Sequence, residues 1–425
     1  MTQTRFIHVA DVHLDSPLAA LKRGDESTGE LLERASRRSM ELLVQNAIEH
    51  DVSAVVIAGD LFDGPVKDAG AGLWVESQFR RLTREKIPVV LIRGNHDAQS
   101  GAGKVIEWPT GVHELGAKAP ESILLEAAGL AIHGQSFGAR SETRDLAVNY
   151  PDRVGGLYNL GVLHTSLSGS SQHDTYAPTS VSILESKGYD YWALGHIHVR
   201  SPESLSERSW IGYSGNTQGR HIRESGPKGC QLITLQDGEL LSNEFLPTDS
   251  LRWYELELDL SQVEHLGDIE EVLESAALPY VESSEGRSLA MRVRLMGATP
   301  LHAELTRSGT VQRLGQTLGA RLAELGTVWL ETIKISTRPT SAPAIEDLVL
   351  PLRYLQTVTS ELQENPVQRA ELESVLEELL KKTRSELAES GWPLALQGEQ
   401  DAELTRLIGS AHDLLVARLA SEEAE

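Results

Sequence analysis

The stretch that decides the fold is residues 6–13, FIHVADVH, an apolar run that leads directly into an aspartate and a histidine. The same order returns in residues 54–60, AVVIAGD, and in residues 89–97, VVLIRGNHD. Short apolar runs that end in polar loops are typical of buried strands in layered α/β proteins. Because sites gather in the loops at strand ends, we expect these polar residues to share one pocket although they are far apart in sequence.

Helical patterns alternate with these strand patterns in the first part of the chain. Residues 30–50 and 73–86 carry apolar side chains close to helical spacing, which indicates βαβ-like alternation. Beyond residue 137 the pattern favours strands, at residues 158–163, 189–194, 209–213, 230–235 and 239–245. The last two runs are joined by Gln236-Asp237-Gly238, a hairpin signal.

Two further regions follow this predicted α/β domain, residues 1–250. Residues 251–338 are typical of a small α+β unit, with strand patterns at 253–260, 289–295 and 328–336 and helical patterns at 263–278 and 311–325. Residues 339–425 begin as a linker and continue as acidic amphipathic helices. We therefore expect three domains, at residues 1–250, 251–338 and 339–425.

The charge balance and the cysteine content limit the possible partners and compartments. The chain of 425 residues has a formal net charge of −23, which argues against coating nucleic acid through bulk electrostatics, so any such contact should be local. The apolar runs are too short to predict a signal peptide or a membrane span. The single cysteine, Cys230, excludes an internal disulfide, so we expect a cytoplasmic protein without membrane contact.

Seven candidate metal ligands follow one another along the chain: Asp11, His13, Asp60, Asn95, His164, His196 and His198. Imidazole nitrogens combined with carboxylate oxygens suit manganese, iron or zinc, whereas an all-oxygen set would indicate magnesium or calcium. Two ions roughly 3.5–4 Å apart need a shared anionic ligand, and a carboxylate such as Asp60 can bridge them. Such a pair activates a shared water to attack phosphorus. The sequence therefore predicts phosphoester hydrolysis by two divalent ions, with Mn²⁺ expected and Fe or Zn as alternatives.

Five short motifs carry a family resemblance: Asp11-Val12-His13, residues 59–63 (GDLFD), residues 94–97 (GNHD), His164-Thr165 and residues 195–198 (GHIH). In order and separation they resemble the signature motifs of calcineurin-like metallophosphoesterases. Residues 10–17 (ADVHLDSP) and 214–221 (SGNTQGRH) are similar to segments of the Mre11 and SbcD group of DNA repair nucleases, most of all to its bacterial YhaO-type proteins. The likeness covers residues 1 to about 250.

The resemblance implies a fold and a role for each motif residue. The fold is an α/β layered sandwich of two mixed β-sheets flanked by helices, with a small α+β capping domain and a helical C-terminal region. One ion would be held by Asp11, His13, Asp60 and His198, and the other by Asp60, Asn95, His164 and His196. His96 is similar to the family's histidine that stabilises the transition state and protonates the leaving oxygen. Asp63 would hydrogen-bond that imidazole and raise its pKa, although some Mre11 proteins carry histidine there.

Arg220 and His221, at the end of the 214–221 segment, are further candidates. The resemblance implies that this loop lies near the metals, and the surrounding stretch is locally basic. Arginine offers two donors to phosphate oxygens, so contact with nucleic-acid phosphate is one interpretation. An ordinary solvated loop is the other, and the sequence leaves both open.

Three functions remain open at this level. The first is a metal-dependent DNA nuclease that acts on DNA ends in repair. Such a nuclease could form a homodimer, and its C-terminal helices would bind an SMC-like ATPase of the Rad50 or SbcC type. The second is a phosphodiesterase or phosphatase for small nucleotides or phosphoproteins. The third is a scaffold subunit for an ATPase, in which metals hold the fold. The complete ligand set favours an enzyme.

Overall fold

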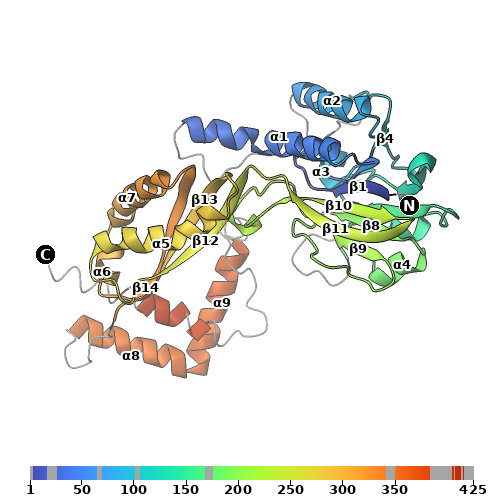
Figure 1. Ribbon diagram of the computed structural model, residues 1–425. Helices are drawn as coiled ribbons and strands as arrows, with labels where there is room; N and C mark the ends of the chain where they lie inside the picture. The colour runs from blue at the N-terminus through green and yellow to red at the C-terminus, as the bar shows by residue number, and fades with distance from the viewer. Residues whose placement is uncertain are drawn as a thin grey trace. The chain divides into compact units, whose positions relative to one another are not determined.

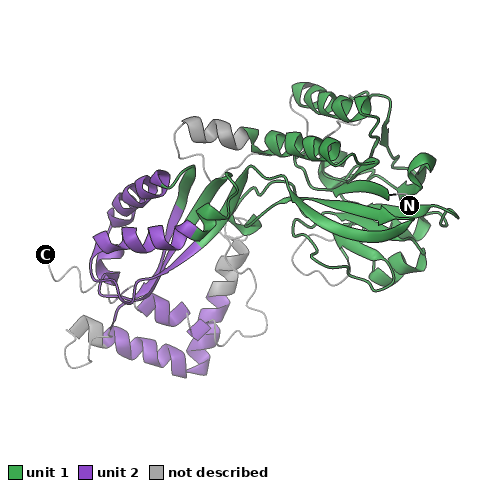
Figure 2. Cartoon of the chain, in the orientation of Figure 1, with its two compact units in different colours: residues 1–255, 279–292, 325–331 green, residues 256–278, 293–324, 332–425 purple. Residues whose placement is uncertain are grey.

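The computed structural model describes residues 3–16, 26–64, 69–100, 106–167, 176–340, 350–382, 404–405, 407–412 and 415. The chain divides into two compact units (Figure 2). The first comprises residues 1–255, 279–292 and 325–331, and the second residues 256–278, 293–324 and 332–425. The division into three domains at 1–250, 251–338 and 339–425 stays a prediction, and most of its linker lies outside the described residues.

A six-stranded sheet in the first unit has the order β11-β10-β1-β2-β3-β4. Strands β1 to β4 run parallel, whereas β10 is antiparallel to both β1 and β11. The bounds are Gln3–Val9 (β1), Ala54–Ala58 (β2), Val89–Ile92 (β3), Val112–Glu114 (β4), Gly229–Gln236 (β10) and Glu239–Pro247 (β11). Positive φ angles at Asp237 and Gly238 close the predicted hairpin between β10 and β11.

A five-stranded sheet in the same unit has the order β5-β6-β7-β8-β9. Only β5 is antiparallel to its neighbour, so this sheet is mixed as well. The bounds are Glu121–Leu125 (β5), Leu130–Gly134 (β6), Tyr158–His164 (β7), Tyr191–Gly195 (β8) and Trp210–Tyr213 (β9). The predicted fold class, a layered α/β sandwich of two mixed sheets, is confirmed.

Strand β2 shows why the apolar runs are continuous. All five of its residues are buried. Val56 faces the core between the two sheets, together with Phe6 and Val162, whereas Val55 and Ile57 belong to the core on the opposite face of the sheet. A strand covered on both faces has no position for a polar side chain, so polar residues appear only where the strand ends.

Helices cover the outer face of the six-stranded sheet. Helix α1 (Glu26–Glu49) and helix α2 (Ala69–Arg84) lie along the same side of it (Figure 1). Met40 of α1 and Phe79 of α2 join Ile57 in one apolar cluster. Two short helices, α3 (Asn95–Ser100) and α4 (Val181–Ser186), also belong to this region.

A separate three-stranded sheet follows, in the order β12-β13-β14, with bounds Leu251–Asp259, Ser288–Ala298 and Val328–Arg338. Helices α5 (Ile269–Glu282), α6 (His302–Leu305) and α7 (Thr310–Glu324) lie between these strands in sequence. The helix predicted from residue 263 begins later, at Ile269, because residues 266–268 form a 3-10 turn. Asp268 directly precedes α5, a position at which aspartate is favoured as a capping residue.

In the predicted helical C-terminal region, residues 404–405 and 407–412 are helical. The two longer helices of this region are α8 (Leu350–Glu364) and α9 (Pro366–Lys382). They meet at Asn365, whose side chain accepts a hydrogen bond from the N–H of Val367. This is the capping role that asparagine favours at the start of a helix. Across the described residues, no helix is long and apolar enough to cross a membrane.

A buried polar network ties the two sheets of the first unit together. His8 of β1 is fully buried, and burial lowers its pKa to about 4, so the ring is neutral. Its Nε2 lies 3.1 Å from the carbonyl oxygen of Leu194 on β8. Its Nδ1 lies 3.0 Å from the hydroxyl of Tyr191, which also lies 3.0 Å from the amide oxygen of Gln231 on β10. The network therefore fixes β1 against β8, whose ends carry candidate ligands.

Replacing Tyr191 with phenylalanine should destabilise the protein while preserving its fold. The change removes the hydroxyl that serves both His8 and Gln231 in the core, and leaving buried polar groups unpaired costs roughly 1–3 kcal/mol. Urea unfolding of the Tyr191→Phe variant would measure the loss. An unfolding free energy equal to that of the unmodified protein would contradict this role for the network.

Candidate metal centre

The predicted ligands lie at strand ends in the first unit. The six-stranded sheet supplies those that follow β1, β2 and β3: Asp11, His13, Asp60 and Asn95. The five-stranded sheet supplies those at or after the ends of β7 and β8: His164, His196 and His198. Because these strands are parallel within each sheet, their carboxyl ends meet at one edge, and the side chains converge there.

The backbone is strained at several of these residues. The angle φ is +52° at Asp11, +45° at His13, +52° at Asp60 and +98° at His196. Such conformations cost of order 1–3 kcal/mol each outside glycine and cluster at functional sites. Hydrogen bonds between loops hold two of them, because the N–H groups of Asp11 and His13 donate to the carbonyls of Gly59 and Asp60, each at 3.0 Å.

Gly94 allows the loop after β3 to approach two ligands at once. A Cβ atom at this position would collide with Oδ1 of Asp60 and would lie 2.8 Å from Nε2 of His164. A side chain there would push both ligands away. Only glycine therefore fits between the two sheets at this point.

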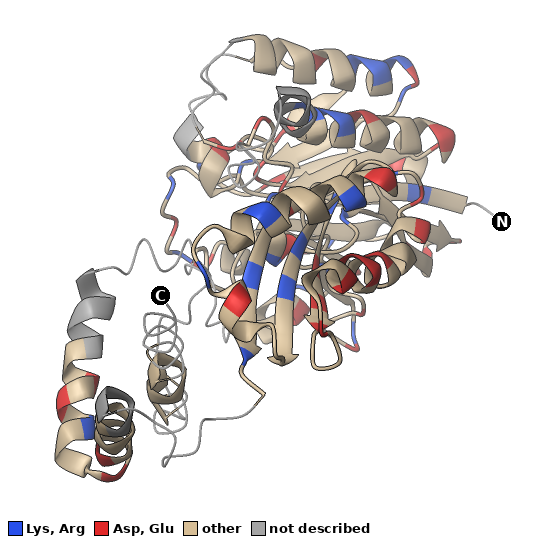
Figure 3. Ribbon diagram, turned by 90° about the vertical axis from the view of Figure 1, so that its left-hand side faces the viewer, with Lys and Arg blue, Asp and Glu red and all other residues tan. Residues whose placement is uncertain are grey.

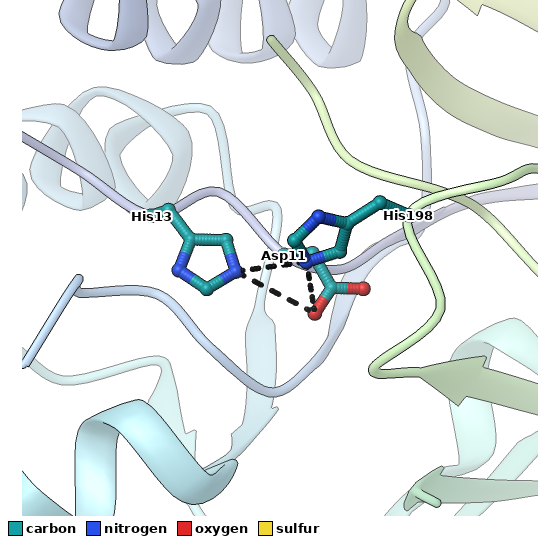
Figure 4. A group of neighbouring side chains, drawn as sticks. All are labelled: Asp11, His13 and His198. Atoms are coloured by element: carbon teal, nitrogen blue, oxygen red, sulfur yellow. Dashed lines mark hydrogen bonds and ion pairs between the residues drawn. The ribbon is translucent and has the colours of Figure 1, made fainter. Parts of the chain in front are cut away.

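Asp11, His13 and His198 form one possible ligand group, with their polar atoms directed toward one another (Figure 4). The Nε2 atom of His13 lies 4.0 Å from Oδ1 of Asp11, and Nε2 of His198 lies 3.9 Å from the same oxygen. Oδ2 of Asp60 is 3.8 Å from Nε2 of His13. These are the four residues predicted for the first ion.

A second possible group is built around Asp60. Its Oδ2 lies 3.4 Å from Nε2 of His164, and that nitrogen lies 3.0 Å from Oδ1 of Asn95. The ring of His196 lies 5.2 Å from the ring of His164, centroid to centroid, and its backbone N–H donates to the carboxylate of Asp11 at 2.9 Å. The structure thus brings all seven predicted residues together, with Asp60 between the two groups. Their division between two ions stays a prediction.

The donor chemistry of three imidazoles fits a pair of cations. His13 and His198 each direct Nδ1 at a carboxylate, Asp63 at 3.2 Å and Glu224 at 2.6 Å. Their Nε2 atoms face each other at 3.1 Å. His164 likewise directs Nδ1 at a carbonyl, that of residue 58, at 2.9 Å. Two neutral rings that carry their protons on Nδ1 would have facing lone pairs on Nε2, and a cation between them, such as a metal ion, would remove that repulsion.

The pKa of His164 leads to the same conclusion. Burial lowers this pKa, but the negative charge of Asp60 outweighs burial and raises it to about 9. Asp11 and Asp60 are only 1% and 2% exposed, so water cannot screen their charges. The buried carboxylates therefore demand positive charge, which divalent ions would provide in place of a proton on His164.

His96 and Asp63 lie beside these groups as the resemblance implied. Nδ1 of His96 is 3.1 Å from Oδ1 of Asp63, and this hydrogen bond raises the pKa of His96 above its ordinary value. Its backbone N–H donates to Oδ1 of Asp60 at 2.9 Å. With Nδ1 engaged, Nε2 is the atom that can give a proton to a leaving oxygen. Asp63 also bonds His13, so one carboxylate serves both a candidate ligand and the candidate acid.

Arg220 lies against the same centre. Its guanidinium is 3.6 Å from Asp63, 3.3 Å from Glu224 and 3.2 Å from Nδ1 of His198. His221 is farther out, with Nε2 3.7 Å from Glu224 and its side chain 39% exposed. The loop is thus part of the site, and its contact with DNA stays a prediction. Sequence reasoning missed Glu224, because nothing in the local pattern indicates that its side chain turns inward.

Asp97 holds two of the ligand loops together, a role that sequence reasoning also missed. Its buried carboxylate accepts hydrogen bonds from the N–H groups of Leu61 at 3.1 Å, Phe62 at 2.8 Å and Gly94 at 3.1 Å. The loops after β2 and β3 therefore share one anchor. Asp60 and Asn95 owe their positions in part to it.

Replacing Asp97 with alanine should lower the free energy of unfolding by roughly 3 kcal/mol, because three backbone donors lose their acceptor. Asp97→Asn should cost less, since its amide oxygen still accepts. Denaturant unfolding of the metal-free proteins would measure both. Equal stability of the two variants would contradict the proposed anchor.

Comparison with known proteins identifies relatives of this chain. A family profile for calcineurin-like phosphoesterases matches residues 4–200, and one for the middle domain of metallophosphoesterase YhaO matches residues 253–338. A Bacillus subtilis (strain 168) protein called uncharacterized metallophosphoesterase YhaO is 33% identical over 327 residues, which are 76% of this chain and 79% of the relative.

Two solved structures are also similar. A dimetal phosphatase from Danio rerio is 13% identical, with a TM-score of 0.34 over 57% of this chain and 99% of that chain. The nuclease MPE of Pseudomonas putida is 23% identical, with a TM-score of 0.19 over 36% of this chain and 57% of that chain.

Fold and site together define a phosphoesterase that works with two metal ions. The chain belongs to the YhaO family of calcineurin-like metallophosphoesterases. The predicted resemblance to this superfamily and to YhaO-type proteins is confirmed. When bound, the two ions supply an activated water and neutralise phosphate charge. Asp63 and Glu224 lie behind the imidazoles of His13 and His198, and the hydrogen bond to Asp63 raises the pKa of His96.

Metal binding should stabilise the protein measurably. A ligand that binds only the folded state at about one hundred times its Kd adds about 2.7 kcal/mol, so Mn²⁺ added to EDTA-treated protein should raise the Tm. Asp60→Asn, which removes the charge predicted to bridge both ions, should abolish most of this rise. Differential scanning calorimetry would test both. A Tm that Mn²⁺ leaves unchanged would contradict a metal centre.

Proposed function

We propose that the protein is a DNA nuclease of the Mre11 and SbcD type, which hydrolyses phosphodiester bonds at DNA ends. The observation that carries this proposal is the charge around the centre. A phosphodiester carries one negative charge, whereas a phosphate monoester carries ≈1.5 to 2 at neutral pH. A centre suited to a diester therefore needs less surplus positive charge than one suited to a monoester.

The charges of the site are closely matched. Four carboxylates take part, those of Asp11, Asp60, Asp63 and Glu224. Two divalent ions would balance them, and the remaining positive charges are Arg220, in contact with two of these carboxylates, and the proton that His96 would carry. His96 would give its proton to the leaving oxygen, so Arg220 is the lasting cation, and one such charge suits a diester monoanion better than a monoester dianion.

The two segments that resemble Mre11 and SbcD proteins also support a nucleic-acid substrate. Residues 10–17 supply Asp11 and His13, and residues 214–221 supply Arg220. Both segments contribute side chains to the same group of charges. Since phosphate contacts position nucleic acid, Arg220 is the residue expected to orient the diester.

The decisive experiment uses end-labelled single- and double-stranded DNA with Mn²⁺. The unmodified protein should degrade it, and His96→Ala should be roughly 100- to 10,000-fold slower at equal metal content, because the leaving oxygen loses its proton donor. A matched control is His113→Ala, since His113 is a half-buried histidine of β4 outside the centre.

Other outcomes would overturn the proposal. Equal DNA breakdown by the unmodified protein and His96→Ala would point to a contaminating nuclease. Hydrolysis of p-nitrophenyl phosphate, nucleotides or phosphoproteins without DNA cleavage would favour the second function, a phosphatase or small-substrate phosphodiesterase. Loss of activity in His113→Ala as well would mean that the substitutions act through the fold.

The same proposal includes partners, metal and compartment. Helices α8 and α9 would dock an SMC-like ATPase of the Rad50 or SbcC type. They contain acidic residues, which are red in Figure 3, and the large hydrophobic residues Tyr354, Val367 and Val375 are 73%, 67% and 59% exposed. The apolar residues expected to form this contact lie at helical spacing in α9: Leu372, Val375, Leu376, Leu379 and Leu380. Of these, the side chains from Leu376 onward lie outside those described. A homodimer, Mn²⁺ as the native ion and a cytoplasmic location complete the proposal, and the buried free thiol of Cys230 suits a reducing compartment.

A further inference from the structure

Glu224 is a buried carboxylate at the end of the short 3-10 turn that follows the 214–221 loop. Its side chain is 7% exposed, and both oxygens are engaged. Oε1 lies 2.6 Å from Nδ1 of His198 and 3.3 Å from the guanidinium of Arg220. Oε2 accepts hydrogen bonds from the N–H of Arg220 at 2.7 Å and from Nδ2 of Asn216 at 2.9 Å.

The hydrogen bond to His198 decides which ring nitrogen is available. Because Nδ1 is held against Glu224, Nε2 is left to face Asp11 at 3.9 Å and His13 at 3.1 Å. A carboxylate behind a ligating imidazole fixes the tautomer, orients the ring and makes the ligating nitrogen more basic. His13 has the same arrangement, with Asp63 behind it.

Arg220 joins these two carboxylates. Its guanidinium lies 3.6 Å from Asp63 and 3.3 Å from Glu224, so one cation spans the partners of two candidate ligands. An arginine whose only task was to neutralise Glu224 would not need to reach Asp63. The arrangement instead links the orientation of His198, that of His13 and the position of the guanidinium.

The loop that presents Glu224 is itself firmly held. The side chain of Gln218 accepts from the N–H of Ser250 at 2.9 Å and donates to the carbonyl of Leu251 at 2.7 Å. Trp253 donates from Nε1 to the carbonyl of Gly219 at 2.9 Å. The loop that leads to Glu224 is therefore anchored at Gln218 and Gly219 to the start of β12.

We propose that Glu224 is a positioning residue of the metal centre, which aims His198 at one ion and holds Arg220 beside the phosphate to be cleaved. The role of Glu224 in orienting His198 toward an ion is inferred from the geometry alone. The part that concerns Arg220 rests on the proposed function, because it takes a phosphodiester as the substrate.

The test compares Glu224→Gln with Glu331→Gln in the full chain. Glu331 is a matched control, because its side chain is also 7% exposed and pairs with an arginine, Arg292, at 2.7 Å, but it belongs to β14. Titration calorimetry with MnCl₂ should show one of two binding events weakened about 10- to 100-fold in Glu224→Gln. Glu331→Gln should bind Mn²⁺ as the unmodified protein does.

Kinetics with bis(p-nitrophenyl) phosphate at saturating Mn²⁺ would test whether Glu224 holds Arg220 beside the phosphate. With both ions bound, Glu224→Gln should raise KM more than it lowers kcat, because the guanidinium is no longer held at the diester. A general loss of structure would change both parameters in both variants. Neither this substrate nor the MnCl₂ titration requires DNA. If the protein does not cut DNA, the proposed nuclease function is wrong, but the role of Glu224 can still be judged from these two measurements.

Two results would overturn the inference. One is unmodified Mn²⁺ affinity in a folded Glu224→Gln protein, and the other is equal weakening in Glu331→Gln. Circular dichroism of the metal-free variants establishes folding. If Glu224→Gln does not fold, Glu224→Asp decides: its shorter side chain withdraws the carboxylate from His198, so it should weaken Mn²⁺ binding, and full affinity would refute the proposed role.

Discussion

The structure of the centre depends on three imidazole rings that donate their N–H groups outward. His13, His164 and His198 each turn Nδ1 toward an acceptor in the protein, so Nε2 of each ring faces the same small buried space. Nitrogen and carboxylate lone pairs at such distances repel unless cations separate them. Favourable contacts elsewhere in the fold must therefore offset the repulsion between these ligands in the metal-free protein. They must also offset the strained backbone conformations of Asp11 and Asp60.

Much of the metallophosphoesterase domain could be predicted from the sequence, for a physical reason. Strands buried on both faces, such as β2, must be wholly apolar, so the first polar residue after each run marks the edge of the sheet. Parallel strands place those residues at one edge, which is why Asp11, Asp60 and Asn95 could be grouped without knowledge of the fold. Helices α1 and α2 could be predicted as well, because each buries one stripe of apolar residues at helical spacing.

Other features could not be predicted, because they depend on contacts between distant segments. Strands β4, β5 and β6 are short or lie near sheet edges, and no alternating pattern marks them. Glu224 looks like an ordinary charged residue in a polar loop until the chain brings it to His198. The compact units also cut through the β12–β14 sheet, which no feature of the sequence indicates. The order of apolar and polar residues in the sequence predicts which strands are buried. The partners of a side chain such as Glu224 can be known only from the folded structure.

The hydrogen bonds between the 214–221 loop and the start of β12 have a consequence for synthesis on the ribosome. Domains begin to fold while the chain is still emerging, amino-terminal parts first. All seven candidate ligands leave the exit tunnel before Gln218 can meet Leu251 or Trp253 can meet Gly219. The loop that carries Arg220 and leads to Glu224 is therefore held in place only after the start of β12 has emerged, later than the ligands themselves.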